Sequence, residues 1–101
     1  MKPIYADFMK SDATNRLVLT CLGTQKDLEK YGVSLKDGLT LVFYNDDEDA
    51  EGKRDDLLVK GVVEYDSVNE RWVAIIDWNA IKNASELRRT KNAILRLCRF
   101  Q

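Results

Sequence analysis

Apolar and polar residues alternate along several short stretches of this chain, which is the pattern of a strand with one buried face. We expect strands over residues 4–8, 17–22, 39–44, 57–65 and 71–76. Gly61 lies inside the fourth stretch and indicates a bulge or a sharp bend, a device that lets a small sheet curl. Residues 72–76 are apolar at every position, so this strand is expected to be covered on both faces.

Two other stretches have the spacing of helices. A short helix is expected near residues 25–31, opened by Thr24 in an approximate capping box and ended by Gly32. A second helix is expected from about Ser85, which is a good N-cap residue. Together the elements predict a mainly β fold, a small curled antiparallel barrel of about five strands, with a compact α+β sheet as the alternative.

The length of 101 residues indicates one domain. We expect a β-rich core over residues 1–81 and a basic C-terminal helix over residues 82–101 that packs on this core. No apolar run approaches the roughly 20 residues of a membrane span. The first residues also lack the apolar stretch of a signal peptide, so a cytoplasmic location without a membrane span is expected.

The segment Gly-Val-Ser-Leu-Lys-Asp-Gly-Leu-Thr-Leu at residues 32–41 resembles the entry of SH3-like barrels, where a turn with glycine precedes a strand. The likeness extends over residues 31–78 and implies an SH3-like barrel with a long bent hairpin. Residues 61–65 and 72–78 are also similar to strands of small bacterial proteins. That second likeness implies no particular activity.

The loop between the third and fourth strands is the most acidic part of the chain. Residues 45–56 hold seven carboxylates, too much charge for a core position. Alternating acidic residues followed by Gly52 resemble a calcium loop, because Ca²⁺ takes several oxygen ligands around a sharp turn. The twelfth position of such a loop is Leu58, where an EF-hand needs glutamate, so a solvated connector stays open as the alternative. The candidate metal ligands are Asp47, Asp49, Glu51 and Asp55.

The net charge of −1 hides an asymmetry. Residues 82–101 carry six basic side chains and one acidic side chain, a net charge of +5, and the preceding residues carry −6. Such a tail is expected to dock on its own acidic body or on an anionic partner. Binding of nucleic acid, or association with the ribosome, is therefore an alternative function of this helix. The candidate anion-binding residues are Arg88, Arg89, Lys91 and Arg96.

The chain contains no histidine, which removes Ser-His-Asp and Cys-His catalysis and histidine-ligated zinc. It also has no glycine-rich phosphate loop and no Cys-x-x-Cys pair. Hydrolysis by carboxylates stays formally open. Cys21 and Cys98 lie among apolar residues and are expected to be free thiols. We therefore expect a protein that is not an enzyme.

Trp72 and Trp78 are spaced to share one strand face if the last strand continues through Asp77. If exposed, they would form the kind of anchor that dominates partner-binding surfaces. The alternative is that at least one of them belongs to the core. The leading hypothesis is a small protein-interaction domain that binds another protein or itself. The alternatives are a calcium-binding module built on residues 46–56, in which calcium is the one expected cofactor, and the nucleic-acid or ribosome-associated protein described above.

Overall fold

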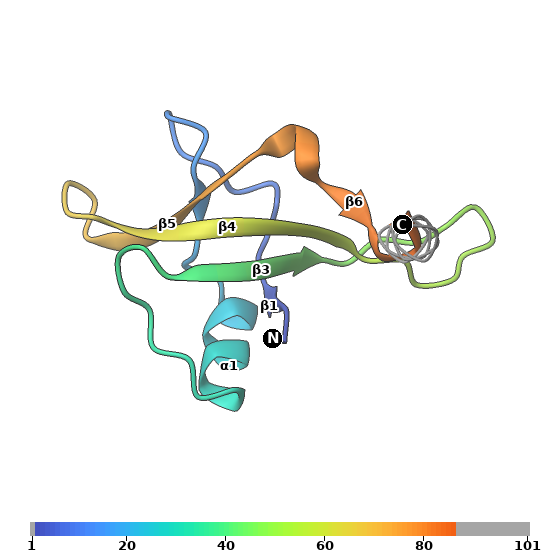
Figure 1. Cartoon of the computed structure of the whole chain (residues 1–101), viewed down its shortest axis with the longest axis horizontal. Helices are drawn as coiled ribbons and strands as arrows, with labels where there is room; N and C mark the ends of the chain where they lie inside the picture. Colours follow the sequence, from blue (N-terminus) through green and yellow to red (C-terminus); the bar gives the residue numbers. More distant parts are fainter. Residues whose placement is uncertain (1, 87–101) are drawn as a thin grey trace, which may run out of the picture.

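The structure is a computed structural model, and it describes residues 2–86. Five strands form one curled sheet in the order β1-β3-β4-β5-β2, and a sixth short strand pairs with β4 (Figure 1). The predicted mainly β fold is therefore confirmed at the level of a small curled half-barrel. The elements are β1 (Ile4–Tyr5), β2 (Leu17–Val18), α1 (Leu22–Lys30), β3 (Thr40–Asn45), β4 (Leu57–Asp66), β5 (Arg71–Ile76), the 3-10 turn η1 (Trp78–Ala80) and β6 (Lys82–Asn83).

Strands β3, β4 and β5 form an antiparallel meander that carries most of the core. Phe43 pairs with Val59, and Val63 pairs with Ala74, so these residues point to the same face of the sheet. Phe43 is completely buried on this face. The buried cluster comprises Ile4, Ala6, Leu17, Leu19, Leu41, Phe43, Val59, Val63, Ala74 and Ile76.

Gly61 lies where the curled sheet leaves no room for a side chain. A Cβ atom at this position would lie 2.7 Å from Ile76 Cγ2 and 3.0 Å from Phe43 Cε2. The ladders from β4 to β3 and β5 continue through Gly61 without a slipped pair. The bulge that the sequence indicated as one option is therefore wrong, and the glycine is required by close packing.

Strand β1 pairs with β3 in parallel, with Ile4 opposite Phe43. The predicted antiparallel arrangement is therefore wrong at this pair, and the sheet is mixed. Parallel neighbours need a long crossover connection, usually with a helix. Here β2 and α1 lie in the chain between the two strands and provide that connection.

Helix α1 covers the free edge of β1. The hydroxyl of the buried Thr24 donates a hydrogen bond of 2.6 Å to the carbonyl oxygen of Tyr5, and Asp27 accepts one of 2.9 Å from the Tyr5 N–H. Both edge groups are thus satisfied, which protects the strand from pairing with another chain. The predicted cap at Thr24 is wrong, because its hydroxyl serves β1 and the helix starts at Leu22. The C-terminal glycine is confirmed, since Gly32 has a φ of +65°.

The end of β5 differs from the prediction. β5 stops at Ile76, and the Asp77 side chain accepts a hydrogen bond of 3.0 Å from the Asn79 N–H, which starts η1. Val73 and Ala74 are buried, but Ile75 is 52% exposed, so the strand is not covered on both faces throughout. Residues 84–86 are helical, and the rest of the predicted C-terminal helix lies outside the described residues. Within residues 2–86 we find no helix that is long and apolar enough to cross a membrane.

One arginine joins the loop before β2 to the C-terminal end of strand β4. Arg16 Nε lies 2.8 Å from Asp12 Oδ2, and its terminal nitrogens lie 3.3 Å from Glu64 and 3.6 Å from Asp66. For Asp12, burial acts to raise the pKa, but hydrogen bonds from Arg16 and Thr14 outweigh it and hold the pKa at about 2. The pKa of Asp66 is also lowered, first by hydrogen bonds from its hairpin neighbour and further by Arg16. Both carboxylates are therefore charged in the folded protein even in mild acid.

Candidate functional site

The acidic loop, defined here as residues 46–56, projects from the end of the sheet where β6 lies, opposite the turn between β4 and β5 (Figure 1). It continues the β3–β4 hairpin, because the Asp55 N–H donates to the Asp47 carbonyl at 2.9 Å. At the tip, Asp49 accepts hydrogen bonds of 2.9 Å from the N–H groups of Glu51 and Lys53. The loop is thus held together by its own hydrogen bonds, while residues 46 and 48–54 are exposed to solvent.

Two carboxylates at the base of the loop hold the end of β6 and the chain that follows it. The Asn83 side-chain amide donates to Asp47 Oδ2 at 2.9 Å and to the Asp55 carbonyl at 2.8 Å. The Ser85 N–H and hydroxyl donate to the two Asp55 oxygens at 3.0 and 2.7 Å. A carboxylate at the start of a helical turn also suits the local positive end of the backbone dipoles. The loop base therefore fixes where the C-terminal segment begins.

The four predicted metal ligands point to separate partners. Asp47 binds Asn83, Asp55 binds Ser85, and Asp49 binds the backbone of its own loop. Glu51 lies 3.8 Å from Lys53 in an exposed ion pair. Over residues 2–86, no three histidine, cysteine, aspartate or glutamate side chains come together in an arrangement that could hold a metal ion. Calcium binding stays a prediction.

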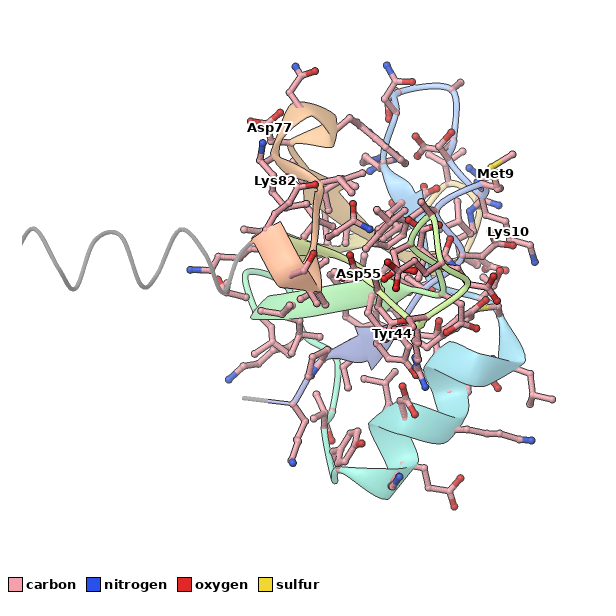
Figure 2. The ribbon with its side chains drawn as sticks, turned by 90° about the vertical axis from the view of Figure 1, so that its right-hand side faces the viewer. Met9, Lys10, Tyr44, Asp55, Asp77 and Lys82 are labelled. Atoms are coloured by element: carbon pink, nitrogen blue, oxygen red, sulfur yellow. The ribbon has the colours of Figure 1, made fainter. Side chains whose placement is uncertain are left out.

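A cavity of about 340 Å³ lies beside the acidic loop, and we call it the tyrosine cavity. Figure 2 looks onto this end of the molecule, and Tyr44 appears there between Asp55 and helix α1. The ring of Tyr44 packs edge-to-face on the ring of Tyr5, with ring centres 5.5 Å apart. This contact restricts the orientation of the Tyr44 ring. Tyr31 is the C-cap residue directly after α1 and is 38% exposed. The cavity is lined by Pro3, Tyr31, Tyr44, Arg54, Asp56, Leu58 and Ala84.

Arg54 joins the tyrosine cavity to a second, acidic cavity of about 620 Å³ that is lined by Asp46, Asp47, Glu48 and Arg54 itself. Its guanidinium lies 6.0 Å from the centre of the Tyr44 ring and 2.9 Å from Asp56 Oδ1. The hydrogen bond to Asp56 raises the pKa of Arg54. Burial, followed by the charge of Asp27, raises the pKa of Tyr44, so its phenol is neutral at pH 7.

The charge around these cavities is strongly negative. The acidic loop carries seven carboxylates and only two basic side chains, a net charge of −5 over eleven residues. Most of these side chains are exposed at the tip of the loop. A negative field of this kind attracts cations, and the adjacent tyrosine cavity combines aromatic and aliphatic residues with Arg54 and Asp56.

The two predicted partner-binding tryptophans do not share a strand face. Trp72 lies on β5, half-buried against the core, with its ring edge-to-face on Tyr65 at 5.0 Å. Trp78 lies in η1 because β5 has already ended, and its Nε1–H donates to the Asn15 carbonyl at 2.7 Å. Both rings thus support the core. The predicted anion-binding residues Arg88, Arg89, Lys91 and Arg96 lie outside the described residues.

The residues that form the tyrosine cavity were missed by the sequence interpretation. Neither Tyr31 nor Tyr44 is among the candidate site residues that the sequence patterns indicate. The available signal was that both aromatic residues precede a turn, one at Gly32 and one at the acidic loop. Aromatic residues with a polar end are frequent at binding surfaces.

Comparison with protein-family models, with curated proteins and with solved structures gives no match to this chain.

Proposed function

We propose that this protein is a non-enzymatic interaction domain that binds a short basic segment of a partner protein. The observation that carries the proposal is the position of the tyrosine cavity directly beside the acidic loop, with Arg54 forming part of both walls. One surface therefore offers a site for an apolar side chain and, next to it, a negatively charged loop. The ligand that this chemistry favours has one or two aliphatic residues flanked by lysine or arginine.

The apolar contribution comes from the aromatic and aliphatic residues of the cavity wall. Tyr44 is held by Tyr5, while Leu58 and Pro3 add aliphatic surface. Tyrosine supplies a large contact area and loses little side-chain freedom on binding, which is why it is enriched at interfaces. A volume of about 340 Å³ is at the small end of ligand cavities, a size that suits one anchor side chain.

The electrostatic contribution comes from the acidic loop. Asp46 and Glu48 are exposed beside Arg54, and they face the acidic cavity. Charges of this kind raise the association rate and select against acidic ligands more than they add to affinity. Binding is therefore expected to weaken as salt concentration rises.

The SH3-like part of the fold interpretation is kept as a proposal for the β3–β4–β5 meander alone. The support is a three-strand antiparallel unit that curls at Gly61. The parallel pairing of β1 with β3 departs from an all-antiparallel barrel. Aromatic-lined grooves are the way SH3 domains take extended peptides, and the tyrosine cavity offers the same kind of contact.

The test is a fluorescence anisotropy titration of the full chain with a short labelled peptide that has a Leu-Ile pair between Arg-Lys flanks. Two matched peptides replace the flanks with glutamate or the pair with serine. We expect saturable binding of the first peptide only. Tyr31→Ala is expected to weaken that binding about tenfold, the loss expected for removing an aromatic contact. The control is Tyr65→Ala, whose ring is equally exposed at 40% but lies at the other end of β4.

Charge is tested separately by the double substitution Asp46→Asn and Glu48→Gln, with Glu29→Gln on α1 as the control. The double variant is expected to bind the peptide more slowly and with a smaller salt dependence. The proposal would be refuted if Tyr31→Ala bound the peptide as tightly as the native chain while Tyr65→Ala bound it more weakly. The peptide would then contact a surface other than the tyrosine cavity.

A further inference from the structure

We infer that the chain's own residues 87–101 are the first occupant of the tyrosine cavity, so that a partner must displace them. This inference rests on the proposed function, because it assigns a ligand and a regulatory role to the same surface. It follows from three observations: where the segment begins, what charge it carries and what chain length it has.

The described chain passes the rim of the cavity just before the segment starts. Ala84 is itself part of the cavity lining. Its N–H donates to the Asp56 carbonyl at 2.8 Å, and the adjacent Ser85 is held twice by Asp55. The described chain ends at Glu86, two residues after Ala84. The hydrogen bonds of the loop base therefore hold residues 84 and 85 at the cavity, shortly before the segment starts.

The composition of the segment complements the surface. Residues 87–101 hold five basic side chains and no acidic one, a net charge of +5 that is equal and opposite to the −5 of the acidic loop. Aliphatic residues lie between the basic ones, which is the peptide chemistry that the proposed function favours. The basic residues are Arg88, Arg89, Lys91, Arg96 and Arg99, and the large apolar residues are Leu87, Ile94, Leu95, Leu97 and Phe100.

The tether makes this occupant a strong competitor. A segment attached next to its own site acts at an effective concentration on the order of millimolar. Fifteen residues span up to about 50 Å when extended. Since Ala84 already lines the cavity, the segment is long enough to reach every part of it. A free peptide of the same chemistry must therefore compete with the tethered segment, and weakening the segment exposes the site.

The test uses the full chain throughout. The segment variant carries Arg88→Glu, Arg89→Glu and Lys91→Glu. The control variant carries Lys10→Glu, Lys26→Glu and Lys36→Glu at exposed positions, which gives both variants the same net charge. The probe is a synthetic peptide with the sequence of residues 87–101. Two-dimensional amide NMR spectra and probe affinities are recorded for the native chain and both variants.

We expect the amides of Tyr31, Tyr44 and Ala84 to shift in the segment variant and to stay in place in the control variant. The probe should bind the segment variant at least about tenfold more tightly than the native chain, because the competitor is gone. Raising the salt concentration of the native chain should move the same amides in the same direction. This second measurement does not depend on how well the variant folds.

The other outcomes separate the two proposals. Equal binding of the probe to the cavity of all three proteins would overturn this inference and leave the proposed function standing. Absence of probe binding in all three, with unmoved amides, would overturn both. Amide shifts in the native chain that grow with protein concentration would assign the occupant to a second copy of the chain and would also overturn this inference.

Discussion

Asp55 accepts two hydrogen bonds from Ser85, one from the backbone N–H at 3.0 Å and one from the hydroxyl at 2.7 Å. The two residues are 30 positions apart in the sequence, so one carboxylate of the acidic loop fixes the chain beyond β6. Ala84, the residue before Ser85, lines the tyrosine cavity. The base of the acidic loop therefore holds the chain after β6 in place, a contact between Asp55 and Ser85 that we call the clamp. The tip of the loop presents a charged surface.

The clamp predicts a loss of stability in Asp55→Ala. The Ser85 N–H and hydroxyl both lose their acceptor, and we expect the free energy of unfolding to fall by about 1–3 kcal/mol. Urea denaturation followed by circular dichroism measures this difference. Glu48→Ala removes an exposed carboxylate from the same loop and is expected to stay within about 0.5 kcal/mol of the native chain. Identical denaturation midpoints for both variants would contradict the clamp.

Protection of the β1 edge by α1 predicts an effect of Thr24→Val. The side chain keeps its shape, but the Tyr5 carbonyl loses a hydrogen bond in a site where Thr24 is completely buried. An unsatisfied buried carbonyl costs about 1–3 kcal/mol. Chemical denaturation checks the value, with Thr40→Val at an exposed strand position as the control. Equal stability of the two variants would show that the contact from Thr24 to β1 is dispensable.

Close packing at Gly61 predicts that Gly61→Ala is destabilising, although alanine generally suits a strand interior better than glycine. The new methyl group would meet Ile76 Cγ2 at 2.7 Å and the Phe43 ring at 3.0 Å. Overpacking of this kind costs about 1–3 kcal/mol. Thermal unfolding should show a lower midpoint, whereas the neighbouring exposed Lys60→Ala should change it little. A raised midpoint in Gly61→Ala would mean that the curl of the sheet can relax.

The lowered pKa values of Asp12 and Asp66 predict a dependence of stability on pH. The pKa of Asp12 falls from 3.8 to about 2 in the folded protein. Between pH 4 and pH 2 the unfolded chain binds more protons than the folded chain, so stability decreases as the pH falls through this window. The contribution of the Asp12 carboxylate to folding stability is fully present above about pH 4. Urea denaturation at a series of pH values measures the slope, and Asp12→Asn should flatten it. An unchanged slope in Asp12→Asn would assign the acid sensitivity to other carboxylates.

Local patterns were sufficient to predict the meander. The alternation of apolar residues through Phe43, Val59 and Val63 identifies both the strands and the buried face, because side chains in a strand alternate with a period of two. Gly61 was recognised as a special position, although the sequence could not show that packing against Ile76 was the reason.

Contacts between distant residues decided what the sequence could not predict. The role of Thr24 depends on its hydrogen bond to Tyr5, 19 residues away. The parallel pairing of β1 with β3 joins segments separated by two other elements, for which periodicity carries no signal. At the candidate site, the acidic loop was found from its charge alone, but the role of Asp55 depends on Ser85, which no local pattern connects to it.

The most direct test of the central claim is an amide NMR titration of the full chain with the peptide that carries a Leu-Ile pair between Arg-Lys flanks. The account predicts saturable shifts that begin at Tyr31, Tyr44, Arg54 and Ala84, the residues around the tyrosine cavity. Shifts confined instead to the exposed pair Val62 and Ile75 on the outer face of the sheet, or no shifts at all, would contradict it.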